Sequence, residues 1–489
     1  MADMQEADTP GADMQEADVQ EYDVIVIGAG STGENVAERA VKGGLTAVIV
    51  ESELVGGECS YWACMPSKAL LRPGQALADA KRVAGSREAA TGTLDVQAVL
   101  ARRDSFTSHW SDKGQVAWLQ GVPIDLIRGR GRLAGERRVE VETSTGSVGL
   151  AARQAVVVAT GSAAALPPVA GLADSRPWTT REATSAKKVP EDLIVLGGGV
   201  AGCELAQAWA SLGSRVTVVE MADRVLAAAE PFASELVLAS MRAGGIEVHL
   251  GTAAASVGRT GDGRVRVELD HGRAIEGDEV LVAAGRRPQT ADLGLESAGL
   301  EPGSWLTVDD SMRVEGVQGG WLYAAGDVNH RALLTHQGKY QGRVCGDAIA
   351  ARARGDIDTG QWSQYSASAD HAAVPSVIFT DPEVASIGYT EARAIEAGLK
   401  VRAVDYPIGN TAGGSLYADD YNGQARIVVD EDRKVIVGAT FVGAGVAELL
   451  HSATVAVVAE VPLSRLWHAV PSYPTISEVW LRLLEAYGL

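Results

Sequence analysis

Short apolar runs recur along the chain, and the most pronounced of them lead into glycine. The first spans residues 22–27, and a second follows at residues 47–50 after a glycine turn and a helix-like stretch. The same order of strand, glycine turn, helix and strand returns with apolar runs at residues 193–196 and 216–219. Continuous short runs of this kind are typical of buried parallel strands. The pattern therefore predicts an α/β fold that contains two β-α-β units.

The last part of the chain has a different pattern. A polar stretch near residues 355–372, which contains Gly and Ser, marks a boundary. Beyond this boundary we predict strands at residues 377–379, 426–429 and 435–441, and helices near residues 390–397, 446–459 and 477–487. This mixture predicts a separate α+β domain at the carboxy terminus.

The first residues form an acidic repeat, because the sequence of residues 2–8 returns at residues 12–18. The segment has almost no β-branched residues and cannot bury a core. We therefore predict a disordered acidic tail over residues 1–20 and expect no catalytic role for it.

Composition excludes several classes of protein. The chain has 489 residues, 46% of them hydrophobic, and no run approaches the roughly 20 apolar residues that a membrane helix needs. A formal charge of −20 argues against nucleic acid as a partner, since nothing would neutralise its phosphates. No secretory signal is recognisable, so we expect a cytoplasmic protein. In that reducing compartment, two close cysteines among four indicate redox or metal chemistry.

The glycines after the first apolar run have the spacing of a dinucleotide-binding loop. Gly28 allows the tight turn, Gly30 lets the backbone approach a pyrophosphate, and Gly33 lets the helix pack closely. The helix amino terminus then faces the phosphates with free N–H groups. Glu51, at the end of the next strand, is placed to accept hydrogen bonds from a ribose diol.

The second unit repeats this arrangement with Gly197, Gly199 and Gly202, and its acidic residue is Glu220. A 2′-phosphate would meet like charge at Glu220, so the sequence favours NAD over NADP. Arg215 and Arg224 lie nearby in sequence and leave NADP open. Both units predict Rossmann-like domains.

Cys59 and Cys64 stand at the start of a predicted helix, shortly after the first glycine loop. A zinc site is excluded because no second Cys or His pair stands at ligand spacing, and we predict no metal site. A reducing cytoplasm disfavours a purely structural disulfide. The two cysteines therefore indicate a redox-active disulfide.

The segment at residues 56–68 resembles the pattern G-G-x-C-x-x-x-x-C-x-P-S-K of the pyridine nucleotide–disulfide oxidoreductases. The other family motifs follow in order at residues 159–161, 285–288, 326–327 and 374–384. The resemblance covers residues 22–489 and implies a homodimer that uses FAD and NAD(P)H. It divides the chain into a FAD-binding domain at residues 21–185 and 306–365, an NAD(P)-binding domain at 186–305 and a dimerisation domain at 366–489.

The resemblance also implies roles for individual residues. Cys64 would lie against the flavin and Cys59 would meet the acceptor. Lys68 would pair with Glu204 and hold a positive charge near the flavin edge, where reduction builds negative charge. Asp327 would bind the ribityl or pyrophosphate part of FAD. The further cofactor-binding residues that the motifs imply are Gly57, Thr160, Gly161, Gly285, Arg286 and Gly326.

One motif departs from the family. Where its disulfide-reducing members carry H-P-T-x-S-E, with a His–Glu pair reaching across the dimer, this chain has Tyr473 and Glu478. Tyrosine titrates near 10 and is a poor base at neutral pH. Mercuric reductases also carry tyrosine here, but this chain has no cysteine pair near residue 489. His468 is a weaker candidate for the missing base, and we expect His336 to pack near the flavin.

Three functions follow from these residues. The leading one is an NAD(P)H-dependent reductase of a small disulfide or thiol-reactive acceptor. The second is reduction of a metal ion or quinone at the flavin–thiolate centre, as in mercuric reductase. The third is a regulatory flavoprotein that senses NAD. The sequence does not name the acceptor.

Overall fold

The computed structural model describes residues 19–489. The predicted tail lies outside the described residues except at its end, where Gln20 already belongs to strand β1 (Gln20–Ile27). The apolar pattern predicted a later start, at Tyr22. The strand begins earlier because the backbone of Gln20 pairs with that of Leu150, and this pairing needs no apolar side chain.

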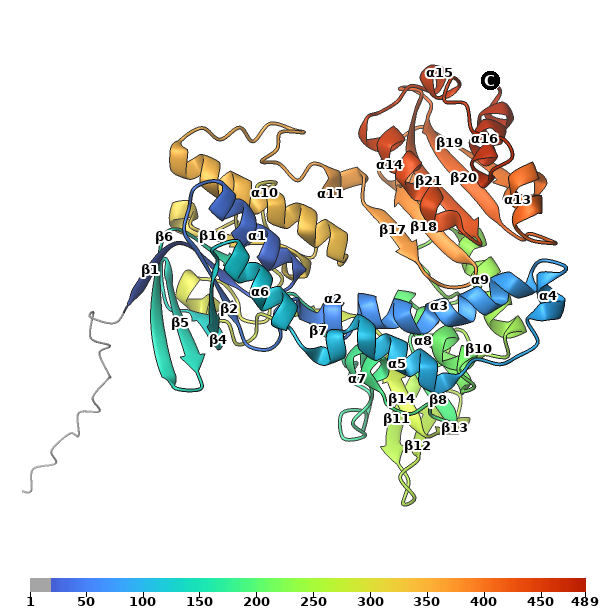
Figure 1. Cartoon of the computed structure of the whole chain (residues 1–489), viewed down its shortest axis with the longest axis horizontal. Helices are drawn as coiled ribbons and strands as arrows, with labels where there is room; N and C mark the ends of the chain where they lie inside the picture. The colour runs from blue at the N-terminus through green and yellow to red at the C-terminus, as the bar shows by residue number, and fades with distance from the viewer. Residues whose placement is uncertain (1–18) are drawn as a thin grey trace, which may run out of the picture.

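The first domain is built on a seven-stranded sheet in the order β3-β2-β1-β6-β5-β4, with β16 paired to β6 (Figure 1). Strands β1, β2, β3 and β16 run parallel to the second half of β6, and β5 pairs with its first half in the antiparallel sense. The strands are β2 (Ala47–Glu51), β3 (Asp125–Arg128), β4 (Arg130–Leu133), β5 (Arg138–Thr143), β6 (Gly146–Val158) and β16 (Leu322–Ala324).

Two helices pack together beside this sheet, α1 (Ser31–Lys42) and α10 (Thr335–Arg354) (Figure 1). Their backbones approach closely because α10 presents Gly338, Gly342 and Gly346 to α1. A Cβ atom at Gly342 would lie 2.7 Å from the carbonyl oxygen of Thr32. This contact fixes the start of α10 beside the glycine loop that opens α1.

The second domain carries the parallel sheet β10-β9-β8-β14 and the antiparallel sheet β11-β12-β13. Its strands are β8 (Asp192–Leu196), β9 (Arg215–Val219), β10 (Glu247–His249), β11 (Ala254–Arg259), β12 (Val265–Leu269), β13 (Ala274–Gly277) and β14 (Glu279–Val282), and its helices are α8 (Val200–Ser211) and α9 (Pro231–Ala243). Strands β7 (Ser162–Ala164) and β15 (Arg286–Pro288) pair with each other and join this domain to the first.

The carboxy-terminal domain is a five-stranded antiparallel sheet in the order β17-β18-β21-β20-β19, with helices packed on it (Figure 1). Its elements include β17 (Pro375–Ile378), β18 (Glu383–Gly388), β19 (Val401–Pro407), β20 (Gln424–Asp430), β21 (Val435–Gly443), α12 (Glu391–Glu396), α13 (Ala412–Tyr417), α14 (Leu450–Val458), α15 (Leu463–Leu466) and α16 (Val479–Tyr487). The predicted helix near residues 446–459 begins as a short 3₁₀ turn before α14. With two Rossmann-like domains and this α+β domain, the predicted fold class is confirmed.

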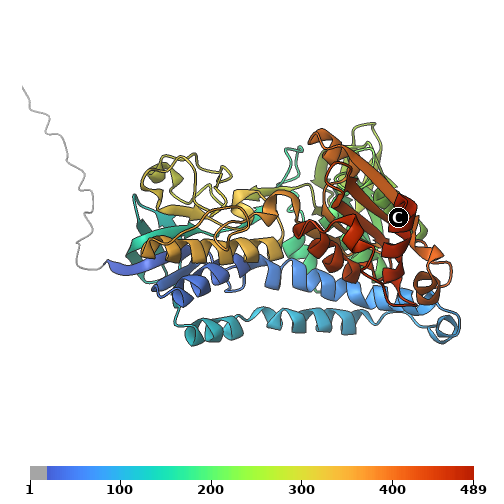
Figure 2. The ribbon, with the colours of Figure 1, turned by 90° about the horizontal axis from the view of Figure 1, so that it is seen from above.

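A layer of helices connects the domains. The short helix α2 (Gly57–Tyr61) and the long helix α3 (Cys64–Lys81) carry the chain from the first domain to the second, where α3 packs on α8. Helices α5 (Val96–Phe106) and α6 (Lys113–Gly121) form an outer layer beneath them (Figure 2). The cysteine segment thus lies where the domains meet.

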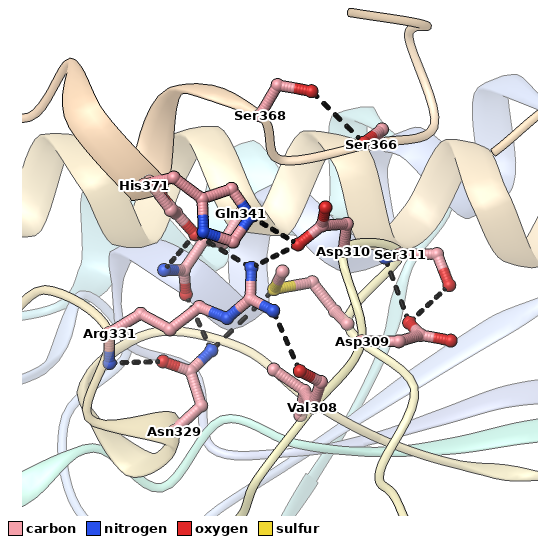
Figure 3. Close-up of polar contacts among 12 residues, drawn as sticks. Val308, Asp309, Asp310, Ser311, Asn329, Arg331, Gln341, Ser366, Ser368 and His371 are labelled. Carbon is pink, nitrogen blue, oxygen red and sulfur yellow. Dashed lines mark hydrogen bonds and ion pairs between the residues drawn. The ribbon is translucent and has the colours of Figure 1, made fainter. Parts of the chain in front are cut away.

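A network of polar side chains joins the linker to the first domain (Figure 3). The linker is the segment between α10 and β17, and it contains α11. The Asp370 carboxylate on α11 (Ala369–Ala372) accepts hydrogen bonds from the side chains of Gln337 and Gln341, at 2.8 and 2.9 Å. The side-chain Oε1 of Gln341 in turn accepts a hydrogen bond from the backbone N–H of Gly326, at 2.8 Å. Arg331 donates a hydrogen bond to the Asp310 carboxylate, at 2.9 Å. The linker is therefore tied to the loop that carries Asp327.

Over residues 19–489, no helix is long and apolar enough to cross a membrane. The same residues contain no group of three or more His, Cys, Asp or Glu side chains that could hold a metal ion.

Candidate active site

The two cysteines open on a cavity of about 1110 Å³ that also takes in the first glycine loop. Nine of the residues predicted to bind a cofactor line this cavity. They are Gly28, Gly30, Glu51, Gly57, Thr160, Gly161, Arg286, Gly326 and Asp327. The structure thus brings together residues from four distant parts of the chain, as one extended cofactor would require.

The shape of the glycine loop fits a pyrophosphate. Gly28 has φ of +106°, and a Cβ atom there would lie 2.4 Å from the carbonyl oxygen of Ala159. A Cβ atom at Gly33 would lie 1.9 Å from the carbonyl oxygen of Gly28, so α1 can start this close only with glycine. A Cβ atom at Gly30 would meet no atom within 4 Å, because this residue faces the cavity.

Several polar groups around the cavity could form hydrogen bonds with a ligand. The Thr160 hydroxyl is buried and has no hydrogen-bond partner in the structure, which is costly unless a ligand or water supplies one. Glu51 accepts hydrogen bonds from the backbone of Ala29 and Glu53, both at 2.7 Å, so it also holds the loop in place. Burial raises the pKa of Glu51. This set of donors, acceptors and glycines fits FAD.

A chain of side chains crosses the cavity beside the cysteines. Asp327 accepts a hydrogen bond from the Ser162 hydroxyl at 2.5 Å, and Arg286 donates to the same hydroxyl at 2.6 Å. Arg286 also forms an ion pair with Glu58, the residue before Cys59. Sequence reasoning missed Glu58 and Ser162. Their only local signal is position, since each adjoins a recognised motif.

The environments of the two cysteines differ, and both are free thiols in the structure. Cys64 is the first residue of α3, where the helix dipole favours a negative charge, and its Sγ lies 3.1 Å from the Thr335 hydroxyl. The hydrogen bond from Cys59, the Thr335 hydroxyl and the charge of Lys68 lower the pKa of Cys64 to about 6, although burial opposes them. Sharing that hydrogen bond, together with burial, raises the pKa of Cys59. Cys64 is therefore the thiolate of the pair.

Lys68 and Glu204 form the ion pair that the family resemblance implies, with 2.5 Å between Lys68 Nζ and Glu204 Oε2. The Glu204 side chain is 4% exposed and that of Lys68 34% exposed. The other carboxylate oxygen of Glu204 accepts from the backbone of Phe379 at 2.8 Å, and Lys68 Nζ lies 5.0 Å from the centre of the Phe379 ring. One carboxylate thus joins all three domains behind the cysteines.

The second glycine loop repeats the first. Gly197 has φ of +111°, and a Cβ atom at Gly202 would lie 1.9 Å from its carbonyl oxygen. Glu220 accepts from the backbone of Gly198 and Ala222, just as Glu51 does in the first loop. Gly199 precedes α8 and Gly285 follows β14, and a Cβ atom at either would meet nothing within 4 Å. The loop lies outside the large cavity.

The structure does not bring Tyr473 and Glu478 to the cysteines of the same chain. Tyr473 is 77% exposed, and among the described residues no side-chain hydrogen bond to it is found. Glu478 is buried, pairs with Arg482 at 2.6 Å and accepts from the backbone of Ala412 at 3.2 Å. Glu478 therefore has partners in its own domain, and Tyr473 is free to meet a second subunit.

Four further sequence interpretations can be compared with the structure. We expected His336 to pack near the flavin, but it does not line the cavity. Its Nε2 instead lies 2.8 Å from the carbonyl oxygen of Pro375 in β17. His468 is exposed. Cys203 and Cys345 are fully buried, which fits their interpretation as residues packed in the core. Between the redox cysteines, Tyr61 is buried and packs, whereas Trp62 lines the cavity and stacks on Arg181.

Residues 22–344 match the family model of the pyridine nucleotide-disulphide oxidoreductases, and residues 374–483 match the model of their dimerisation domain. The chain belongs to this family, whose members are flavin-dependent oxidoreductases that use a pyridine nucleotide and a redox-active disulfide. The dimerisation domain supports a homodimer. The predicted family and enzyme class are confirmed.

Curated relatives match the chain over almost its whole length. It is 32% identical over 471 residues to dihydrolipoyl dehydrogenase of Thermus scotoductus, which covers 95% of this chain and 97% of the relative. It is 31% identical over 464 residues to dihydrolipoyl dehydrogenase of Chlamydia muridarum, covering 94% and 95%.

Solved structures share the fold. The Cu(II) complex of the HOCl-induced flavoprotein disulfide reductase RclA from Escherichia coli matches with a TM-score of 0.81 at 22% identity, covering 96% of this chain and 99% of that one. LpdA from Mycobacterium tuberculosis matches with a TM-score of 0.82 at 25% identity, covering 96% and 100%.

Proposed function

We propose that this enzyme passes electrons from NADH to a low-molecular-weight disulfide through Cys64 and Cys59. The observation that carries the proposal is the environment of Cys64, a thiolate at a helix amino terminus beside Thr335 that opens on the cavity fitted for FAD. The first glycine loop, Thr160 and Asp327 would hold FAD, which would supply the two-electron chemistry that links the nicotinamide to the disulfide. Lipoamide is the first acceptor to test, because the curated relatives are named dihydrolipoyl dehydrogenases.

Cys64 and Cys59 then have different roles in the reaction. The Cys64 thiolate is stabilised by Thr335 and by the charge of Lys68. Cys59 keeps the proton in the reduced pair because its pKa is raised, and it attacks the acceptor once it has lost that proton and become a thiolate. Attack by the Cys59 thiolate would break the acceptor disulfide, release the first acceptor thiol and form a mixed disulfide at Cys59, whose Cys59 sulfur the Cys64 thiolate then attacks. The Cys59–Cys64 disulfide is then restored, and the second acceptor thiol leaves.

NADH is the favoured donor over NADPH. Glu220 would repel a 2′-phosphate at the second glycine loop. Arg215 cannot compensate, since it bonds to Asp192 and Glu191 at the start of β9, the end of the sheet away from the loop. We therefore expect the enzyme to be reduced at about tenfold lower concentrations of NADH than of NADPH, which parallel titrations would measure. Equal concentrations would contradict this preference.

Anaerobic titration of the FAD-loaded enzyme with NADH tests the thiolate. Two-electron reduction should produce a long-wavelength absorbance that arises from the Cys64 thiolate beside the flavin. Because the pKa of Cys64 is lowered to about 6, the band should persist above pH 6 and fade as the pH falls through 6 towards 5. A flavin that bleaches without any such band would exclude the cysteine relay.

Reduction of a thiol-reactive metal ion at the same centre is a second candidate, favoured by Tyr473 in place of the base that disulfide exchange uses. Its support is the exposure of Tyr473 and the absence of any bond from it to Glu478 in residues 19–489. Turnover of lipoamide and glutathione disulfide, measured beside cupric and mercuric ions, separates the two candidates.

A further inference from the structure

A second hollow contains charges that the chemistry above does not use. Its volume is about 520 Å³, and it lies between α1, α6 and α10. Glu34 and Glu38 face it from α1, Trp118 from α6 and Lys339 from α10.

The helix geometry places Lys339 one turn beyond Thr335, the residue that contacts the redox pair. Thr335, whose hydroxyl contacts Cys64 Sγ at 3.1 Å, is four residues before Lys339 on α10. Residues four apart lie on the same face of a helix, about one turn from each other. The hydrogen bond with Cys64 and burial raise the pKa of Cys59, and the charge of Lys339 opposes this rise.

Glu34 lies opposite Lys339 with an unsatisfied carboxyl. Its Oε1 atom is buried and has no hydrogen-bond partner in the structure. Burial raises the pKa of Glu34 to about 7, Lys339 opposes this shift and Glu51 adds to it. The first turn of α1 adjoins the cysteine segment, since a Cβ atom at Gly57 would lie 2.7 Å from the Cα atom of Gly30.

Other charges near this pair are few. Glu38 is paired with Lys42 at 2.6 Å, and Lys68 is paired with Glu204. The residues that α6 and the preceding turn contribute to the hollow do not titrate; they are Ser108, Gly114, Gln115 and Trp118. Lys339 is thus the positive charge of this hollow, one helical turn from Thr335, and Glu34 is the half-buried carboxyl that opposes it.

We propose that Lys339 is a positioning residue that stabilises the Cys59 thiolate from within the same chain, and that Glu34 tunes its effect. The charge would favour the Cys59 thiolate where the family's histidine base is replaced by Tyr473. This inference rests on the function proposed above. Lys339 takes no proton and forms no bond. It favours the thiolate that attacks the acceptor, and an ionised Glu34 weakens that effect as the pH rises.

Alkylation of the NADH-reduced holoenzyme by iodoacetamide tests this without any acceptor, with the modified residue located by peptide mapping. In Lys339→Met, the midpoint pH for alkylation of Cys59 should rise by about one unit, and the rate at pH 7 should fall about tenfold. Lys339→Arg should restore the rate to within about twofold of the wild type. Glu34→Gln should lower the midpoint, the opposite direction.

Arg343→Met is the matched control, because it removes a positive charge from the exposed face of α10 one turn further from the cysteines. It should change the rate less than about twofold. If Lys339→Met alkylates as fast as Arg343→Met, the proposal is overturned. A shifted midpoint in an enzyme that turns over no disulfide would uphold the role of Lys339 and overturn only the proposed acceptor.

Discussion

Replacing Cys64 by serine is expected to lower disulfide turnover by more than about a thousandfold, because a serine hydroxyl can neither form the disulfide nor supply a thiolate. The same variant should lose the long-wavelength band at every pH. Steady-state reduction of lipoamide by NADH measures the first effect, and anaerobic spectra measure the second.

Two controls separate loss of chemistry from loss of structure. Cys345→Ala removes a buried thiol from α10 and should keep turnover within about twofold. Reduction of ferricyanide should survive in Cys64→Ser, because a one-electron dye can take electrons without the disulfide. Disulfide turnover that persists in Cys64→Ser would contradict the relay.

Replacing Glu204 by alanine should destabilise the protein by about 3 kcal/mol and slow flavin reduction by NADH at least tenfold. The variant leaves the backbone N–H of Phe379 without its acceptor and Lys68 without its counter-ion. Lys68 is one-third exposed, so water recovers part of its loss and the lower end of the range for buried ion pairs applies. Urea unfolding and rapid-mixing kinetics measure the two effects.

Gln207→Ala provides the comparison for this variant. Gln207 lies on the same helix and bonds to the backbone of Asp381 through both side-chain atoms, at 2.7 and 2.9 Å, without any charge. It should cost about 1–2 kcal/mol and leave flavin reduction near normal. If Glu204→Ala costs no more than Gln207→Ala, the ion pair contributes nothing beyond its hydrogen bonds.

The glycine loops could be predicted because their requirements are local. A strand, a turn with positive φ and a helix within a few residues are all visible in the sequence, and Gly28 and Gly197 adopt the same conformation. The pairing of Lys68 with Glu204 was also predictable, but only through the resemblance to a family, since 136 residues separate them.

Other contacts depend on how the domains meet, and no local pattern encodes them. The bond from Phe379 to Glu204, the pairing of Arg286 with Glu58 and the placement of Lys339 opposite Glu34 all join distant segments. His336 illustrates the converse, because its position beside a flavin motif predicted a place at the cofactor. Its side chain instead turns to strand β17 of the third domain.

The buried carboxylate of Asp370 determines where this chain can be divided. Although Asp370 comes after the end of α10, both of its carboxylate oxygens accept hydrogen bonds from glutamines of α10, Gln337 and Gln341. Suppose that the dimerisation domain of a relative were joined to this chain at the end of α10. Gln337 and Gln341 would then be separated from Asp370, and their side-chain amides would lose their hydrogen-bond acceptor. We therefore expect an exchangeable dimerisation module to begin at β17, with α11 kept together with the flavin half of the enzyme.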